Sequence, residues 1–374
     1  MAKYRFDQIA INSTEKKKPA EEDRFTYLGL EHLDSGTLRV TRFGTEVAPV
    51  GEKLVMHKGD VLFGKRRAYQ KKVAIAPFDG IFSAHGMVLR PKEDVIDKDF
   101  FPLFISSDYF LDAAIKISVG SLSPTINWRD LKELEFELPD LTAQHKLAEI
   151  LWSINDTMEA YKKLISATDE LVKSQFIGWS KSISRSAYRT LDSICTLITD
   201  GTHQPPKFVS CGIPFLLVSN ITSNKVTYAT DKYITEEMYL ELSKRTPVEV
   251  GDILLSTVGS YGHPAIVKEN REFSFQRHIA FLKPDHDQVD SVYLHAAILS
   301  SDVQKQIDSL VLGVAQKTLN LSAIKKIEIP LPNMAQQKQF AGFVRQSDKS
   351  KFELEQALAE LNATYKRIIA ENLG

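Results

Sequence analysis

The two halves of this 374-residue chain repeat one another along most of their length. A Gly-Asp pair precedes the apolar run 61–63 in the first half and the run 253–255 in the second. One residue is then inserted in the second copy, and the offset between the copies stays constant to the C-terminus. The matched pairs at this offset include Phe82 with Phe275, His85 with His278, Pro91 with Pro284, Gly120 with Gly313, Thr125 with Thr318, Asn127 with Asn320, Pro139 with Pro332 and Gln144 with Gln337. Such a repeat indicates two copies of one domain.

Each copy ends in a long segment with helical periodicity. From residue 142 to about residue 177, large side chains recur at alternating steps of three and four, the pattern of a helix that packs against another helix. We place this seam at Leu147, Leu151, Ile154, Met158, Tyr161, Ile165, Thr168, Val172 and Gln175. The matching seam in the second copy is Phe340, Val344, Ser347, Lys351, Leu354, Leu358, Leu361, Tyr365 and Ile368. A helix of about 36 residues would span roughly 54 Å, so we expect the two helices to pair, antiparallel if a two-fold axis relates the copies.

The repeat and the two helices together predict the fold class. We expect an α+β protein with a pseudo-two-fold internal repeat, in which two globular domains are separated by an antiparallel pair of long coiled-coil helices. A Leu-Pro pair closes each globular part, because the residue before proline avoids helical geometry. The predicted parts are a first globular domain over residues 1–141, a central helix over 142–179, a second globular domain over 180–333 and a C-terminal helix over 334–374.

Composition and short motifs narrow the functional class. With 43% hydrophobic residues, the chain can bury sizeable cores. It has no apolar run of membrane-spanning length and no apolar signal-peptide core near its N-terminus, so we expect a cytoplasmic protein without a membrane partner. Cys195 and Cys211 cannot form a disulfide framework, and with His203 they fit no usual zinc spacing. We interpret them as structural thiols and expect no metal site.

Motifs for catalysis are also missing. The sequence contains no phosphate-binding P-loop, no H-E-x-x-H zinc helix and no G-x-S-x-G nucleophile elbow. Gln204-Pro205-Pro206-Lys207 lacks the Asn or Asp that precedes the prolines in amino-methyltransferase motifs. We therefore predict no catalytic residues, no cofactor and no enzymatic activity. The net charge of −1 argues against indiscriminate binding to polyanions.

Polar loops after equivalent strands are suited to sequence-specific DNA recognition. The loop 64–72 of the first copy carries several basic residues and no acid, whereas the loop 256–263 of the second copy is rich in serine and glycine. Arginine, lysine and glutamine side chains can donate to base edges and phosphates. The copies agree at scaffold positions and diverge in these loops, as two domains of one fold would if they read different targets.

We select the candidate DNA-binding residues from these loops and from two neighbouring motifs. They are Lys65, Arg66, Arg67, Tyr69, Lys71, Lys72, His85, Thr202, His203, Gln204, Lys207, Thr257, Ser260, Tyr261, Gln276, Arg277 and His278. We expect the lysines to contact phosphates, and we expect base contacts from Arg66, Arg67, Gln276 and Arg277. The alternatives are a solvated basic loop, a strand-end pair formed by Gln276 with Arg277, and a shared structural role for the two histidines.

The order and duplication of the motifs carry a family resemblance. In the second copy the motifs lie at 200–206 (DGTHQPP), 251–262 (GDILLSTVGSYG), 273–284, 313–320 and 329–332 (IPLP), followed by Gln336 and Gln337. In the first copy they lie at 59–65 (GDVLFGK), with Arg67 and Tyr69, and at 137–139 (ELP), followed by Gln144. In this arrangement the chain resembles the specificity subunit of type I restriction-modification systems. The first copy departs from the pattern, because residues 12–19 (NSTEKKKP) stand where the second copy has 200–206.

The resemblance implies a function that the motifs alone do not give. Each of two target-recognition domains would read one half of a bipartite double-stranded DNA sequence. The helices would act as the spacer and as the dock for two methyltransferase subunits, which bind S-adenosylmethionine and methylate adenine, and two restriction subunits can join such complexes. The alternatives are a methylase-only or fused system, a self-contained methyltransferase, and a coiled-coil scaffold that binds no DNA.

Overall fold

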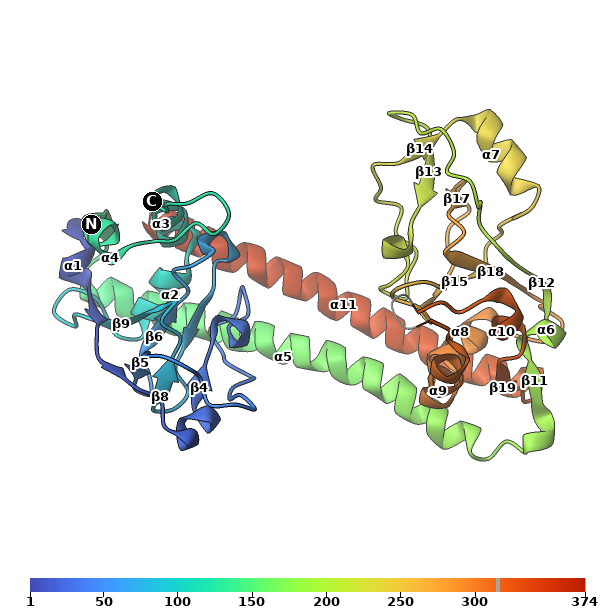
Figure 1. Cartoon of the computed structure of the whole chain (residues 1–374), viewed down its shortest axis with the longest axis horizontal. Coiled ribbons are helices and arrows are strands. Elements are labelled where there is room, and N and C mark those ends of the chain that lie inside the picture. Colours follow the sequence, from blue (N-terminus) through green and yellow to red (C-terminus); the bar gives the residue numbers. More distant parts are fainter. Residues whose placement is uncertain (314–316, 374) are drawn as a thin grey trace. The chain divides into compact units, whose positions relative to one another are not determined.

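The computed structural model describes residues 1–313 and 317–373 (Figure 1). The chain forms two compact units, the first comprising Met1–Lys162 with the C-terminal segment from Gln356, and the second comprising Lys163–Glu355. Each unit combines sheets and helices and contains part of both long helices, α5 (Leu141–Ser180) and α11 (Met334–Leu373). The predicted α+β class is confirmed. Residues 314–316 of the motif at 313–320, and residue 374 of the predicted C-terminal helix, lie outside the described residues.

The first unit is built on two four-stranded sheets. Antiparallel pairing gives the strand order β2-β9-β6-β7 in one sheet, and the other has the order β3-β5-β8-β4 with β4 parallel to β8. Its strands are β1 (Ala2–Arg5), β2 (Ala10–Ser13), β3 (Lys16–Lys17), β4 (Tyr27–Leu28), β5 (Lys53–Met56), β6 (Val61–Phe63), β7 (Val73–Ile75), β8 (Gly80–Phe82), β9 (Met87–Pro91) and β10 (Glu135–Leu138). Its shorter helices are α1 (Phe6–Ile9), α2 (Phe100–Ser106), α3 (Asp108–Lys116), α4 (Trp128–Leu131) and the 3₁₀ helices η1 (Glu21–Phe25), η2 (Leu30–His32) and η3 (Ala68–Gln70).

The second unit repeats this plan. A four-stranded antiparallel sheet has the order β12-β18-β15-β16, and β13 pairs with both β14 and β17, in parallel with the latter. Its strands are β11 (Tyr188–Thr190), β12 (Cys195–Asp200), β13 (Ile213–Leu216), β14 (Tyr233–Ile234), β15 (Ile253–Ser256), β16 (Pro264–Ile266), β17 (Ser274–Phe275), β18 (Ile279–Pro284) and β19 (Glu328–Pro330). Its shorter helices are α6 (Leu191–Ile194), α7 (Glu236–Ser243), α8 (Ser291–Leu299), α9 (Ser301–Leu310), α10 (Leu321–Lys325) and the 3₁₀ helices η4 (Arg185–Ala187) and η5 (Val218–Asn220).

The long helices contribute to the core of each unit. In the first unit, Leu151 of α5 and Ile369 of α11 join a core that also contains the aromatic side chains of Phe6, Phe110 and Phe136. The Phe6 ring centroid lies 5.0 Å from that of Phe110 and 6.0 Å from that of Phe136. The beginning of α5 and the end of α11 therefore share one core.

Contacts within the second unit give the direction of the helix pair. Near the end of α5, the Phe176 ring lies 5.4 Å from the ring of Phe340, which is near the start of α11. Earlier in α5, Asp169 accepts a hydrogen bond from Lys351 at 2.7 Å, and Lys351 comes later in α11. Residues that come earlier in α5 thus meet residues that come later in α11, so the expected antiparallel pairing is confirmed in this unit.

The predicted seam of α5 is wrong at its last position. Gln175 is exposed, whereas the neighbouring Phe176 is 2% exposed and packs in the core of the second unit. A straight α-helix has 3.6 residues per turn, so its buried face drifts relative to a strict heptad repeat of 3.5. The sequence seam followed the heptad, and the drift moves the buried position by one residue at this end of the helix.

A buried glutamine ties each long helix to its own unit. Gln144 is 1% exposed, and its Oε1 accepts from the Asp97 N–H at 2.8 Å. Its Nε2 donates to the carbonyls of Val95 at 3.1 Å and Pro139 at 2.8 Å. Gln337 makes the equivalent three bonds in the second unit. Its Oε1 accepts from the Asp290 N–H at 2.9 Å, and its Nε2 donates to the carbonyls of Gln288 at 3.0 Å and Pro332 at 2.9 Å. The internal repeat therefore extends to individual hydrogen bonds.

Substitution of Gln337 by alanine is expected to lower the free energy of unfolding by about 2 kcal/mol or more, because it removes three hydrogen bonds that each contribute about 0.5–1.5 kcal/mol. Gln144→Ala should have a similar effect on the first unit. Urea denaturation measures both changes. Gln336→Ala is the matched control, since Gln336 is exposed on the next position of the same helix. Equal midpoints for the Gln336 and Gln337 variants would contradict this role.

Candidate nucleic-acid interface

In each unit an exposed arginine lies beside a histidine, and the two histidines occupy equivalent positions of the repeat. His85 follows β8 and His278 follows β17. In the first unit the Arg66 guanidinium lies 3.4 Å from His85 Nε2, and in the second the Arg277 Nε–H donates to His278 Nε2 at 3.3 Å. Arg66 reaches its histidine from the loop after β6, whereas Arg277 is adjacent to its histidine in the chain. The two units thus build the same pair by different routes.

Backbone hydrogen bonds hold the segments that carry these pairs. In the first unit the Arg66 N–H donates to the His85 carbonyl at 3.3 Å, and the Ile126 N–H donates to the Lys65 carbonyl at 2.9 Å. The second unit has a similar arrangement. The Thr257 N–H donates to the His278 carbonyl at 3.0 Å, and the Leu319 N–H donates to the Thr257 carbonyl at 2.8 Å. Three segments distant in sequence are therefore fastened together without using the loop side chains, which leaves those side chains free to differ between the units.

The local charge favours neutral imidazoles beside cationic guanidinium groups. Partial burial lowers the pKa of His85, and the charges of Arg66 and Lys65 lower it further. Burial, followed by the charge of Arg277, lowers the pKa of His278 in the same way. Both rings are therefore mainly neutral at pH 7, since the ordinary pKa of histidine is about 6.5. Each exposed arginine presents a planar set of donors, which match guanine O6 and N7 or a phosphate.

The remaining basic residues of the first loop have different surroundings. Lys71 Nζ lies 2.7 Å from carboxylate oxygens of both Asp108 and Asp112. Lys72 Nζ donates to the Leu30 carbonyl at 2.6 Å. These two ammonium groups are held within the unit by partners far away in sequence. By contrast, Arg67 is exposed, and so is Tyr69, with 57% of its surface accessible.

The loop after β15 also combines internal and exposed side chains. Thr257 is only 5% exposed, so its hydroxyl does not lie on the surface. The Tyr261 hydroxyl donates to Asp308 at 2.9 Å, while Ser260 is exposed. Ser260 is therefore the most accessible of the three candidates in this loop.

The motif at 200–206 is organised by Asp200. The carboxylate lies 3.0 Å from His203 Nε2 and accepts from Arg245 at 2.6 Å. At Gly201, a Cβ atom would lie 2.2 Å from the Phe275 carbonyl oxygen, so a larger residue would displace the backbone. Asp200 and Gly201 are therefore structural, and they leave the following Gln204 exposed together with Lys207.

This motif meets the second histidine-arginine pair. Thr202 forms a parallel β-bridge with Gln276, and its carbonyl accepts from the Arg277 N–H at 3.0 Å. In the second unit the structure thus brings together the candidates Thr202, Gln276, Arg277 and His278. In the first unit it brings together Lys65, Arg66 and His85.

Sequence reasoning missed residues that lie next to these clusters. Lys16 and Asn127 line a pocket with Lys65 in the first unit, and Arg245 holds the Asp200 carboxylate in the second. Lys16 lies on a two-residue strand, which carries no periodicity. A signal was available for Asn127, because it matches Asn320 in the repeat.

Among residues 1–313 and 317–373, no cluster of histidine, cysteine or acidic side chains is arranged to hold a metal ion. No helix in the same ranges is both long and apolar enough to cross a membrane. Burial raises the pKa of Cys195 to about 12, so this thiol stays protonated, whereas Cys211 is exposed.

Comparison with known proteins identifies relatives of both halves. The sequence model described as "Type I restriction modification DNA specificity domain" matches residues 15–167 and 186–363. The type I restriction enzyme EcoBI specificity subunit of Escherichia coli is 28% identical over 197 residues, which are 52% of this chain and 40% of that protein. The chain thus matches about two fifths of the length of this relative. The MjaVIII specificity subunit of Methanocaldococcus jannaschii is 22% identical over 89% of this chain and 82% of its own length.

The fold has a counterpart among solved structures. The crystal structure of the type I restriction-modification system S subunit from M. genitalium matches 100% of this chain and 96% of that chain, with a TM-score of 0.56 and 15% identity. At this identity the likeness supports the fold alone. The sequence match, which covers most of both halves, shows that the chain belongs to the family of type I restriction modification DNA specificity domains.

Proposed function

We propose that this chain is the DNA sequence-specificity subunit of a type I restriction-modification complex, and that each unit binds one half of a bipartite double-stranded DNA target. The observation that carries this proposal is the duplicated arginine-histidine pair, Arg66 with His85 and Arg277 with His278. A backbone hydrogen bond holds each of these arginines, from the Arg66 N–H to the His85 carbonyl and from the Arg277 N–H to the Thr202 carbonyl. The divergent loops around the two pairs fit half-sites of different sequence.

The long helices have a second role in this proposal. They set the distance between the half-sites and dock two methyltransferase subunits that bind S-adenosylmethionine, and restriction subunits can join. The complex acts in the cytoplasm, and this chain contributes recognition rather than chemistry. Apolar side chains on the helix surface support docking: in the second unit Leu164, Leu171 and Phe352 are 50%, 46% and 57% exposed. Leu164 and Leu171 are seven residues apart and therefore lie on one face of α5, and exposed apolar side chains that form a patch mark protein interfaces.

Methylation mapping tests the proposal directly. Methylated adenines are mapped in DNA from cells with and without this chain, and a bipartite motif is expected to vanish when the chain is deleted. An unchanged methylation pattern would contradict the proposal. Calorimetry tests the alternative of a self-contained methyltransferase, which requires the isolated chain to bind S-adenosylmethionine. A scaffold that binds no DNA would give no sequence-dependent shift of duplex DNA, even with methyltransferase subunits present.

Arg277→Ala is expected to weaken binding to the preferred target by about 1–3 kcal/mol and to relax the preference at one base pair. The guanidinium is exposed and held by His278, so its loss removes donors without leaving a buried group unpaired. Competition binding of the assembled complex to a panel of duplexes measures both effects. Lys207→Ala is the control, because loss of an exposed phosphate-contacting lysine weakens all sequences alike. An equal loss for every duplex with Arg277→Ala would exclude a base contact.

A further inference from the structure

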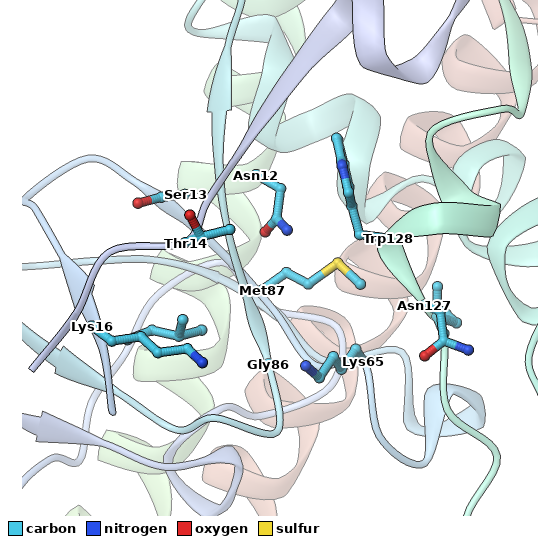
Figure 2. Close-up of a pocket in the computed structure, with 11 residues that line it drawn as sticks. Asn12, Ser13, Thr14, Lys16, Lys65, Gly86, Met87, Asn127 and Trp128 are labelled. Carbon is cyan, nitrogen blue, oxygen red and sulfur yellow. The ribbon is translucent and has the colours of Figure 1, made fainter. Parts of the chain in front are cut away.

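The first unit contains a pocket of about 300 Å³ that is lined by Lys65 and Gly86, the chain neighbours of Arg66 and His85 (Figure 2). Its polar lining comes from four segments: Asn12, Ser13 and Thr14 at the end of β2, Lys16 on β3, Lys65 after β6, and Asn127 before α4. Met87 and Trp128 add an apolar wall. This volume lies at the lower end of the range of about 300–1,000 Å³ for small-ligand pockets.

The pocket gathers positive charge without a balancing carboxylate. No acidic residue is among its lining residues. In the described part of the chain, neither Lys16 nor Lys65 has a carboxylate oxygen within ion-pair distance. Figure 2 shows the two lysine side chains extending toward the same space. Burial, followed by the charge of Lys16, lowers the pKa of Lys65, which means that this ammonium group has unfavourable surroundings that a bound anion would improve.

The second unit fills the equivalent place differently. Ser13 pairs with Val88 in the first unit, and Thr199 pairs with the repeat-equivalent Phe281 in the second. If Thr199 is aligned with Ser13, then Asp200 stands at the position of Thr14 and Thr202 at that of Lys16. The repeat also places Thr257 at the position of Lys65. In the second unit, Asp200 is bound by His203 and Arg245. Threonines replace both lysines there, so the two lysines that line the pocket are particular to the first unit.

We propose that this pocket binds a phosphate group, and that the phosphate belongs to the DNA backbone of the half-site read by the first unit. The assignment to DNA rests on the function proposed above. Lysine ammonium groups, hydroxyls and side-chain amides are common donors to phosphate oxygens, and the wall formed by Met87 and Trp128 suits the adjoining deoxyribose. Lys65 and Gly86 line the pocket and immediately neighbour Arg66 and His85. A phosphate held here fixes the register in which Arg66 meets the base edges.

The test combines salt dependence with neutralised phosphates. The Lys16→Gln, Lys65→Gln double variant is assembled with its methyltransferase subunits, and its affinity for target duplex is measured against salt concentration. Loss of one phosphate contact is expected to reduce the slope of log K against log salt by about 1. The control is Lys17→Gln, since Lys17 neighbours Lys16 but pairs with Asp23 at 2.9 Å. The slope of the control should match that of the wild type.

Methylphosphonate substitution identifies the phosphate itself. Single neutral linkages are placed along the first half-site, and one position is expected to weaken the wild-type complex while leaving the double variant unaffected. Equal losses for wild type and variant at every position, together with an unchanged salt slope, would overturn the pocket assignment and leave the proposed function standing. Absence of sequence-specific binding by the wild type would overturn both. Lys16→Gln alone, at an exposed position, repeats the test if the double variant does not fold.

Free inorganic phosphate is the other ligand that could supply a phosphate group to this pocket. The isolated chain is titrated with inorganic phosphate while Trp128 fluorescence is followed in a variant that retains only this tryptophan. We expect saturation only at phosphate concentrations far above those of the duplex that saturate the complex, and no response from the double variant. Tight binding of inorganic phosphate that does not compete with duplex would overturn the assignment to DNA.

Discussion

Replacing Phe340 with alanine is expected to lower the free energy of unfolding of the second unit by about 3–5 kcal/mol, the range for deleting a buried aromatic ring. Phe340 is 7% exposed and lies near the start of α11. Its ring centroid is 5.4 Å from those of Phe176 and Trp179 and 6.1 Å from that of Tyr293. The truncation would therefore leave a cavity where both long helices meet the core of this unit.

Urea denaturation followed by tryptophan fluorescence measures this effect. The indole of Trp179 stacks on Phe340 with an interplanar angle of 10°, so its emission should also report the local change. Phe352→Ala is the matched control, because Phe352 lies on the same helix but is 57% exposed. We expect that variant to change stability by about 0.5 kcal/mol or less. If the two variants had the same midpoint, α11 would contribute little to the core of the second unit.

The sequence predicted those parts of the fold that are written twice. A pair such as Gln144 and Gln337 stands at a constant offset because both side chains satisfy the same three backbone groups in their own units. The glycines of the Gly-Asp turns recur for a similar reason, since Gly59 and Gly251 both have positive φ, at 95° and 101°. The same backbone geometry requires the same residue in both copies. The repeated residue therefore allowed these structural positions to be predicted from the sequence.

Other features depend on contacts between residues that have no recognisable spacing. Lys71 and Lys72 read as part of a basic loop, but their ammonium groups bind Asp108, Asp112 and the Leu30 carbonyl. The number of basic residues in a loop therefore overestimates how many of them are available to contact DNA. The sequence also failed to predict the phosphate pocket. Lys16 and Lys65 line the same pocket because of strand pairing, and no pattern in the sequence predicts that pairing.

Lengthening both long helices by one heptad is expected to change the spacer of the recognised DNA target by about three base pairs, without changing either half-site. Seven helical residues add about 10.5 Å at 1.5 Å per residue, and B-DNA rises about 3.4 Å per base pair. The insertions belong between Lys162 and Lys163 in α5 and between Glu355 and Gln356 in α11, where the chain passes between its two units. A whole heptad keeps the seam side chains of both helices on the paired face.

Methylation mapping in cells that express the lengthened chain measures the result, and a two-residue insertion in α5 alone serves as the control. That control turns the seam of one helix away from its partner, so we expect it to abolish methylation instead of moving it. The half-sites should survive in the heptad variant because Arg66 and Arg277 are placed by backbone bonds inside their own units, which the insertion does not touch. A changed half-site with an unchanged spacer would mean that the helices contribute to base recognition and do not set the spacing.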